Sequence, residues 1–213
     1  METVKKLWPR IWAFIIDVVI VFLLSSMICN IKFLNPTYDE YSKKYDEYQE
    51  IYQKFQDGKL DVSDFYKQTD NLTYDLYRYG TSNYIIYLVV IIGYFVFFQK
   101  YSNGQTIGKR VNKIKVVNSN GDNPSIKIYL LRVMFIFILG LGGIFSGITC
   151  AILPHLLSSS NLSTWISAVS ITNMLLALID LEVLIARKDR KALHDIVCNT
   201  MVVECTEQTK TLD

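Results

Sequence analysis

The chain has 213 residues, of which 51% are hydrophobic and 20% are charged, and its formal net charge is +2. The hydrophobic residues gather in four almost purely apolar blocks, Ile11–Ile31, Tyr84–Phe98, Ile128–Leu153 and Leu162–Ala186. A membrane-spanning helix needs about 20 apolar residues, and a soluble fold of this length has too little chain to cover four such helices. The composition therefore excludes a soluble globular protein and predicts an all-α integral membrane protein with four transmembrane helices.

Residues 1–31 are predicted to form the first transmembrane helix. Lys5, Lys6 and Arg10 precede an apolar run, as in a signal peptide, but no small-residue cleavage site follows. Asp17 lies within the apolar run, where a charge costs about 2.5–3.5 kcal/mol on insertion scales. The helix is therefore expected to be retained, and Asp17 is expected to have a polar partner or a function.

Residues 32–81 carry aromatic side chains at intervals of three or four, which places them on one face of a helix. These side chains are Tyr38, Tyr41, Tyr45, Tyr48, Tyr52 and Phe55. Gly58 interrupts the pattern, and Asp61 or Ser63 can cap a second helix. We predict an extracytoplasmic Tyr-rich helical hairpin. Packing of the tyrosines against one another is the simpler interpretation, and a binding platform for a sugar or a partner is the alternative.

Residues 82–99 are predicted to form the second transmembrane helix, and a basic loop at 100–127 follows it. Within this loop, Ile114–Val117 is a short β-like run that ends at a cluster of turn residues. Thr200–Val203, near the C-terminus, is a second run of the same kind. We predict that the two runs pair as a small cytoplasmic β-strand pair.

The inner loop contains two glycines and a lysine, as a phosphate-binding loop does: Gly104, Gly108 and Lys109. Such a loop has four residues between its glycines, and only three separate them here. A nucleotide site is therefore disfavoured, and anionic lipid headgroups are the alternative partners of this basic loop.

Residues 128–186 are predicted to form the third and fourth transmembrane helices, and 187–213 a cytoplasmic C-terminal segment. Lysine and arginine are concentrated before the first block, in 100–127 and after the fourth block, whereas 154–161 contains neither. Because cytoplasmic loops carry the excess of these residues, we predict a multi-pass protein of the cell membrane with both termini cytoplasmic.

The predicted third helix has two further features. A Gly-x-x-x-Gly pattern at 143–147 is typical of close helix packing. Cys150 falls near the outer end of this helix, as Cys29 does in the first, and the two could form a disulfide. Free cysteines are the simpler interpretation.

Charged residues are expected at similar depths in several of the helices. Asp17 lies seven residues after Arg10, and Asp180 lies seven residues before Arg187, which is about 10 Å along a helix at about 1.5 Å per residue. We expect Asp17 to face Arg132, with an acidic side chain of the fourth helix nearby. The expected charged cluster consists of Arg10, Asp17, Arg132, Asp180 and Glu182.

This cluster is open to more than one interpretation. Ionisable residues inside a membrane pair with one another and mark ion or proton pathways. Asp17 and Arg132 form either a structural pair that fixes helix packing or a site of ion handling. Arg10 alone has the simpler interpretation of a boundary residue whose side chain reaches the interface.

Three separated segments contain distinctive motifs. The pattern Arg-x-x-Ala-x-x-x-Asp runs from Arg10 to Asp17, the inner loop contains Gly-x-Thr-x-Gly-Lys-Arg at 104–110, and the C-terminal segment contains Ala-Leu-His-Asp at 192–195. These motifs resemble those of the RDD family of membrane proteins, which is named for one arginine and two aspartates. Arg132, just inside the third apolar block, matches an arginine that is often found there in the family, and Asp195 is the candidate second aspartate. Gln99 is a departure, because relatives often have an acid near this position. The matching motif residues are Gly104, Thr106, Gly108, Lys109, Arg110, His194 and Asp195.

The resemblance implies two classes of function. Some members of the family are linked to sodium or proton exchange, so a cation- or proton-coupled transporter that uses the charged cluster is the first hypothesis. Others look like subunits or scaffolds of membrane complexes, so a non-catalytic scaffold or accessory subunit is the alternative.

Enzyme activity is not expected, because no serine or cysteine lies in a recognisable nucleophile setting with a base. His155 and His194 are predicted on opposite membrane faces, and His194 with Cys198 lacks the paired spacing of a zinc site. Neither a metal nor a cofactor is therefore expected. The expected partner is the lipid bilayer, with a second copy of the chain or another membrane protein as candidates, and no nucleic acid.

Overall fold

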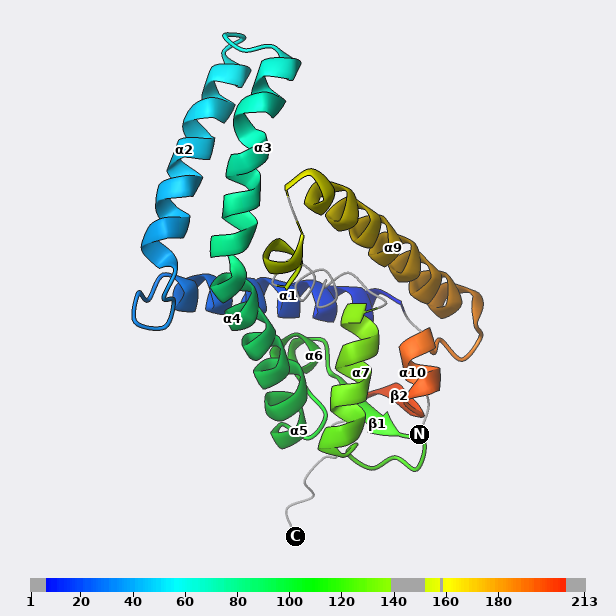
Figure 1. The fold of residues 1–213 in the computed structure, drawn as a ribbon. Coiled ribbons are helices and arrows are strands. Elements are labelled where there is room, and N and C mark those ends of the chain that lie inside the picture. Colours follow the sequence, from blue (N-terminus) through cyan, green and yellow to red (C-terminus); the bar gives the residue numbers. More distant parts are fainter. Residues whose placement is uncertain (1–6, 139–151, 158, 206–213) are drawn as a thin grey trace. The chain divides into compact units, whose positions relative to one another are not determined.

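The computed structural model describes residues 7–138, 152–157 and 159–205. The regular secondary structure of the described residues is helical apart from one pair of strands (Figure 1). The internal contacts of the chain divide it into two compact units. The first contains residues 1–23, 90–142 and 174–213, and the second contains residues 24–89 and 143–173.

Three helices in the described part of the chain are long and apolar enough to cross a membrane. They are α1 (Trp8–Cys29), the continuous stretch Thr81–Tyr101, and Thr164–Ala186 within α9 (Ser159–Ala186). The second stretch consists of α4 (Thr81–Ile92), the π-helix η1 (Gly93–Phe98) and α5 (Gln99–Tyr101). These three correspond to the predicted first, second and fourth transmembrane helices.

The predicted third transmembrane helix is described only at its start, as α7 (Ile126–Ile138). Residues 139–151 lie outside the described residues, and they contain the glycine pattern at 143–147 and Cys150. A short helical turn follows at 152–156. The third transmembrane helix as a complete span, the close packing through these glycines and a disulfide with Cys29 therefore stay predictions.

The second unit contains the helical hairpin. Helices α2 (Tyr38–Gln56) and α3 (Val62–Tyr79) pack along each other, and the predicted Asp61 is the N-cap of α3, accepting a hydrogen bond from Asp64 N at 2.7 Å (Figure 1). The ring of Phe65 on α3 packs among aromatic rings of α2, with centroid distances of 4.7–6.3 Å. The aromatic periodicity thus builds the contact between the two helices, which favours packing over a platform. The extracytoplasmic position of the hairpin stays a prediction.

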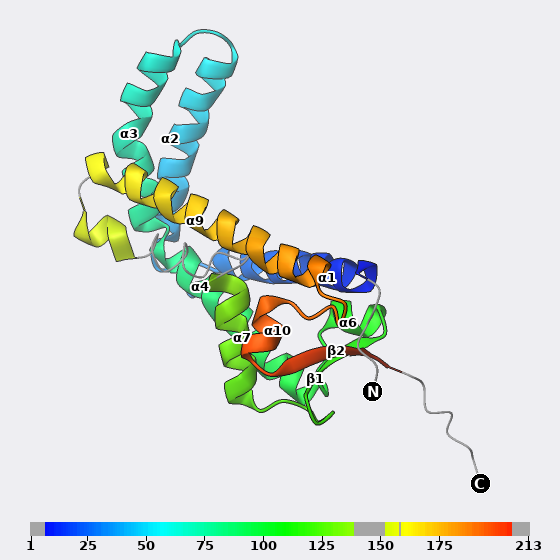
Figure 2. The same ribbon diagram turned by 90° about the vertical axis from the view of Figure 1, so that its right-hand side faces the viewer.

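The first unit contains a two-stranded antiparallel sheet of β1 (Ile114–Asn118) and β2 (Thr200–Glu204). The predicted strand pairing is confirmed, since β1 and β2 lie side by side (Figure 2). In their register Val117 is opposite Met201. The sheet is covered by α6 (Ile107–Val111), which contacts β1, and by α10 (Leu193–Val197), which contacts β2 and α7. It therefore joins the C-terminal segment to the loop after the second span.

Substitution of Met201 by proline is expected to destabilise this sheet. Hydrogen-bonded and non-bonded pairs alternate along an antiparallel ladder, and the flanking bonds Ser119 N to Asn199 O and Cys205 N to Lys113 O place Met201 in a bonded pair. Proline removes that N–H, and an unpaired buried acceptor costs about 1–3 kcal/mol. The free energy of unfolding in detergent measures the loss.

Glu204→Pro is the matched control for this prediction. Glu204 lies in the same strand but in a non-bonded pair at its exposed end, so its N–H does not point at β1. Equal losses from the two prolines would contradict the assigned ladder.

Candidate functional site

The carboxylate of Asp17 lies inside the first unit, with only 1% of the residue exposed. Its Oδ1 accepts hydrogen bonds from Tyr94 Oη at 2.7 Å and from the backbone N of Gly108 at 2.8 Å. Its Oδ2 accepts a hydrogen bond from Thr106 Oγ1 and lies 3.7 Å from the ammonium of Lys109. Both oxygens of Asp17 therefore have hydrogen-bond donors, which explains how the first span can contain a carboxylate.

Three of these contacts, those of Thr106, Gly108 and Lys109, come from the start of α6, and local chemistry explains why. The first N–H groups of a helix have no partner within it. Thr106 caps α6 by accepting from Lys109 N at 3.3 Å, Ile107 N donates to Tyr94 Oη at 3.0 Å, and Gly108 N donates to Asp17. The N-terminal end of a helix also favours a negative charge. The loop that resembled a phosphate cradle thus binds the protein's own carboxylate.

The two glycines of the motif are required by close backbone approaches. Gly104 has a φ of +85°, and a Cβ there would lie 2.3 Å from the carbonyl oxygen of Val116. At Gly108 a Cβ would lie 2.1 Å from the carbonyl oxygen of Ala13 in α1. The first glycine therefore lets the chain turn onto β1, and the second lets α6 contact the side of α1.

Tyr94 reaches Asp17 from the π-helical turn η1. A π-helical turn contains an extra residue per turn, and such turns are frequent at functional sites. The extra residue shifts the side chains after Gly93 around the helix axis relative to a regular α-helix. No charge or motif in the sequence indicated Tyr94 as a partner of Asp17.

Lys109 is held more loosely than the other partners of Asp17. Its ammonium lies 3.2 Å from Thr106 Oγ1, 3.7 Å from Asp17 and 5.6 Å from the centroid of the Phe95 ring. Only 15% of its side chain is exposed. Burial lowers the pKa of Lys109 to about 8, because it outweighs the opposing effect of Asp17.

Raising the pH above 8 is expected to increase the contribution of Lys109 to folding stability. The unfolded chain keeps the ordinary lysine pKa of 10.5, whereas the folded pKa is about 8, so between these values the unfolded state binds more protons. Stability rises with pH where the unfolded state binds more protons. The free energies of unfolding of the wild type and of Lys109→Met are measured from about pH 8 to about pH 10. The value for the wild type minus that for the variant should increase as the pH rises. A difference that stays constant with pH would contradict the lowered pKa.

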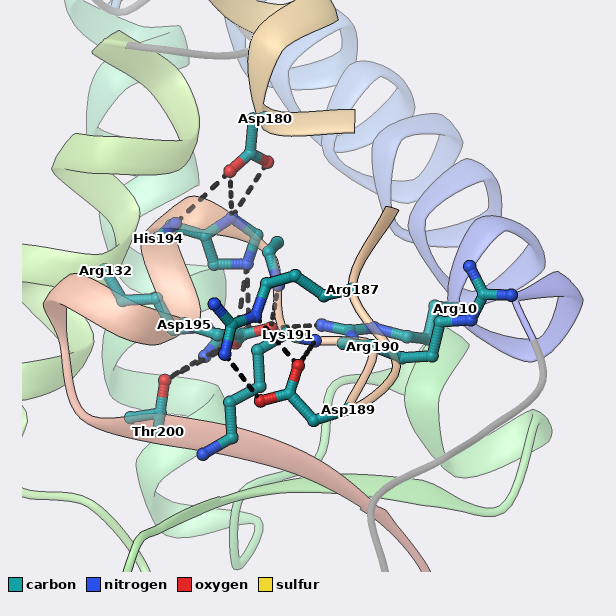
Figure 3. Close-up of polar contacts among 11 residues, drawn as sticks. Arg10, Arg132, Asp180, Arg187, Asp189, Arg190, Lys191, His194, Asp195 and Thr200 are labelled. Carbon is teal, nitrogen blue, oxygen red and sulfur yellow. Dashed lines mark hydrogen bonds and ion pairs between the residues drawn. The ribbon is translucent and has the colours of Figure 1, made fainter. Parts of the chain in front are cut away.

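Asp195 on α10 is the second buried carboxylate, with 0% of the residue exposed. It forms ion pairs with two guanidinium groups, those of Arg10 on α1 and Arg132 on α7 (Figure 3). It also accepts hydrogen bonds from Ala192 N at 3.2 Å and from Thr200 Oγ1 at 3.4 Å. Burial alone would raise the pKa of Asp195, but the positive charge around it, chiefly that of Arg132, holds that pKa well below its usual range.

His194 extends this network to Asp180 on α9. Its Nδ1 lies 3.0 Å from Asp180 Oδ2, and its backbone N donates to Asp180 Oδ1 at 3.2 Å (Figure 3). Its Nε2 lies 3.2 Å from a guanidinium nitrogen of Arg132. Since a guanidinium can only donate, Nε2 is assigned as the acceptor, and the ring proton is placed on Nδ1, where it points at Asp180.

The network ties several helices to one another. Direct contacts run from Asp180 on α9 to His194 on α10, and from there to Arg132 on α7. Arg132 contacts Asp195 on α10, which contacts Arg10 on α1. Together with the Asp17 site, the network contains three side chains that carry positive charge at neutral pH and three carboxylates. These are Arg10, Lys109 and Arg132, and Asp17, Asp180 and Asp195.

The predicted pairing of Asp17 with Arg132 is wrong. Depth along a helix does not fix the direction in which a side chain points, and α6 packs against α1 and takes up both oxygens of Asp17. Arg132 pairs with Asp195 instead. Arg10 is likewise an ion-paired residue of the network rather than a boundary residue that reaches the interface.

Two other predicted site residues lie outside the network. Glu182 is exposed, because it follows Asp180 by two residues and so points about 200° away around a helix of 3.6 residues per turn. Arg110 is also exposed, although the residue before it contacts Asp17. Neither Tyr94 nor Thr200 was predicted as part of the charged site, because neither is charged. Among the described residues, no three histidine, cysteine or acidic side chains gather to hold a metal ion.

Apolar helices of membrane-spanning length, with a network of buried charges beside them, define an integral membrane protein. The chain matches the sequence model of the RDD family over residues 4–199, and it belongs to that family. The resemblance seen in its three motifs is thereby confirmed. No curated protein and no solved structure matches the chain.

Proposed function

We propose that this protein is a membrane transporter that exchanges a monovalent cation, with sodium as the first candidate, for a proton at Asp17 and Lys109. The observation that carries the proposal is the loose contact between the two side chains, 3.7 Å apart in a buried site. The ammonium of Lys109 acts as the positive counter-charge of the Asp17 carboxylate. When Lys109 gives up its proton, another cation can bind to this carboxylate in its place.

The atoms around the ammonium suit a hard cation. Oxygen ligands are what such cations prefer, and Asp17 Oδ2 and Thr106 Oγ1 are the oxygens beside the Lys109 ammonium. When the ammonium loses its proton, the carboxylate loses its counter-charge. One bound cation then replaces one proton, so the charge of the site is unchanged.

The pKa of Lys109, which burial lowers to about 8, brings this proton within reach of the pH of a cell. The site at Asp195 is unsuited to the same exchange. Arginine does not lose its proton in proteins, and Asp195 is bound by two guanidinium groups. In this proposal the Asp195 network is a rigid frame that holds α1 and α7 beside the exchanging pair.

The test is sodium-driven proton flux in liposomes that contain the purified protein and a pH-sensitive dye. We expect flux for the wild type and at least a tenfold loss for Asp17→Asn and Lys109→Met. Lys109→Arg should also be inactive, since arginine keeps the positive charge but does not give up its proton. Asp189→Asn, at an exposed ion pair with Arg187, is the matched control and should retain flux.

Flux that survives Asp17→Asn and Lys109→Arg would overturn the proposed site. A wild type that moves no proton with sodium, lithium or potassium would overturn transport itself. All variants are compared only when their melting in detergent shows that they fold.

A scaffold or accessory subunit is the second candidate function. The carboxylates of the site are satisfied by partners within the chain, which is what a purely structural network requires. Exposed aromatic side chains on the hairpin, such as Tyr66 at 66%, would then serve contacts with a partner. Loss of co-purified protein on deletion of 38–79, without any flux in the wild type, would favour this candidate.

A further inference from the structure

Helix α6 lies beside the interior of a membrane-spanning helix rather than beyond its end. Gly108 touches the carbonyl of Ala13, and its N–H binds Asp17. Ala13 and Asp17 follow Trp8, the first residue of the span, by five and nine positions. At about 1.5 Å per residue they lie about 7 Å and about 13 Å along α1. Helix α6 is therefore at the depth of the leaflet in which α1 begins.

The backbone of α6 meets the requirement for such a depth. Irregular backbone is tolerated within a membrane only where its polar groups are bound by protein or water. The N–H groups of Ile107, Gly108 and Lys109 are bound by Tyr94, Asp17 and Thr106 in that order. At the other end, the carbonyl of Gly108 accepts from Asn112 N and Nδ2.

The outward edge of α6 is apolar. Ile107 is 41% exposed and Val111 is 65% exposed, and the two lie one turn apart. Arg110 is exposed next to Val111. Trp8 and Trp12, at the start of α1, are 67% and 53% exposed, as is usual for tryptophan at the level of the lipid headgroups.

We infer that α6 is a membrane-embedded re-entrant element whose edge is covered by phospholipid. Acyl chains contact Ile107 and Val111, and a lipid phosphate binds the guanidinium of Arg110. A lipid is the occupant because this edge lies at the depth of the first turns of α1, whose exposed residues face the same leaflet. Long arginine side chains reach the interface from such positions, and guanidinium binds phosphate through paired hydrogen bonds.

Spin labels at single cysteines test the depth of α6 in vesicles of phosphatidylcholine and phosphatidylglycerol. Labels replace Val111, Ile15 as the reference on the exposed side of α1 between the two positions that α6 contacts, or Asn120 as the control in the exposed turn after β1. The native cysteines are replaced by alanine. We expect the label at 111 to favour collision with oxygen over a nickel chelate, as at 15, and the label at 120 to show the reverse. A label at 111 that behaves like the one at 120 would overturn the inference.

A photoreactive benzophenone amino acid at 111 gives a second measurement in a chain that keeps its cysteines. Ultraviolet light should attach it to phospholipid, as identified by mass spectrometry. Adducts only to another protein chain, or none to lipid, would overturn the inference even if the cysteine-free chain does not fold.

Arg110→Gln tests the headgroup contact. We expect at least a fivefold loss in the preference of the protein for phosphatidylglycerol over phosphatidylcholine, with no effect of added inorganic phosphate. Lys188→Gln, at another exposed basic residue, is the matched control and should change the preference less than twofold. Equal losses from the two substitutions, or competition by inorganic phosphate, would overturn the role of Arg110.

Discussion

Replacement of Asp195 by asparagine is expected to lower the free energy of unfolding by about 3–5 kcal/mol, the loss typical when one member of a buried ion pair is removed. The carboxylate is fully buried and is bound by the guanidinium groups of Arg10 and Arg132. Asparagine has nearly the same shape, so the packing is retained while two buried positive charges lose their counter-charge. Unfolding in mixed micelles, followed by circular dichroism, measures the loss.

Asp189→Asn is the matched control for this prediction. Asp189 is also paired with an arginine, Arg187, but the two side chains are 37% and 47% exposed. Exposed pairs contribute about 0–1 kcal/mol, so the same substitution should have little effect there. If both substitutions cost the same, the Asp195 network does not stabilise the fold through its buried charges.

A second substitution separates the ion pair from other effects. Arg132→Gln in the Asp195→Asn background removes one of the two unpaired positive charges. We expect the double variant to recover part of the stability, because the energies of residues in contact are not additive. Full additivity of the two losses would contradict a direct pairing of Arg132 with Asp195.

The elements of the fold that local patterns determine could be predicted from the sequence. The spacing of the tyrosines predicted the first helix of the hairpin, Gly58 and the candidate caps Asp61 and Ser63 predicted the second, and both helices are present. The β-branched runs at 114–117 and 200–203 predicted a strand pair, and the two strands pair antiparallel. Each of these predictions depends on residue types and their spacing within a short segment, which the sequence contains directly.

The contacts of the site could be predicted only in part. The rise of a helix placed Asp17 and Asp180 at comparable depths, and both accept hydrogen bonds from partners within the first unit, Asp17 in its own site and Asp180 in the Asp195 network. The rise does not give the rotation of a helix about its axis, so it could not say which charges meet. The π-helical turn that presents Tyr94 changes this rotation within a single span.

Asp195 is a site residue that an argument from depth along a membrane helix could not identify. It lies outside the apolar blocks, so no insertion penalty drew attention to it, and only its likeness to a family motif indicated a role. The strand pair explains its position, because β2 follows α10 and brings Thr200 to both Asp195 and Arg132. The small sheet thus positions α10 so that Asp195 meets both Arg10 and Arg132.

The two buried carboxylates differ in how firmly they are held. Asp195 is bound by two groups that keep their protons, whereas Asp17 has one charged partner, Lys109, and that partner lies 3.7 Å away with a lowered pKa. A substitution that disturbs the position of α6 should therefore affect the Asp17 site and leave the Asp195 network in place. Gly108 is the residue through which this can be tested.

Gly108→Ala is expected to destabilise the protein by about 1–3 kcal/mol from overpacking, with a further loss from the Asp17 contacts. The added methyl would lie 2.1 Å from the carbonyl oxygen of Ala13, which is backbone and cannot rotate away. Helix α6 must therefore move, and its movement weakens the hydrogen bond from Gly108 N to Asp17. Hydrogen bonds to charged groups contribute about 1.5–3 kcal/mol, so part of this amount adds to the overpacking.

Gly93→Ala makes the same chemical change where the structure leaves room. A Cβ at Gly93 has nothing within 4 Å, and alanine in a helix is favoured over glycine by about 0.5–1 kcal/mol. We therefore expect the two substitutions to change the free energy of unfolding in opposite directions, and flux to fall only for Gly108→Ala. Similar losses of unfolding free energy from both substitutions would mean that glycine is required at both positions for backbone flexibility, and not for a specific contact. Opposite signs would instead tie the second glycine of the motif to the contact between α6 and α1, and through it to the binding of Asp17.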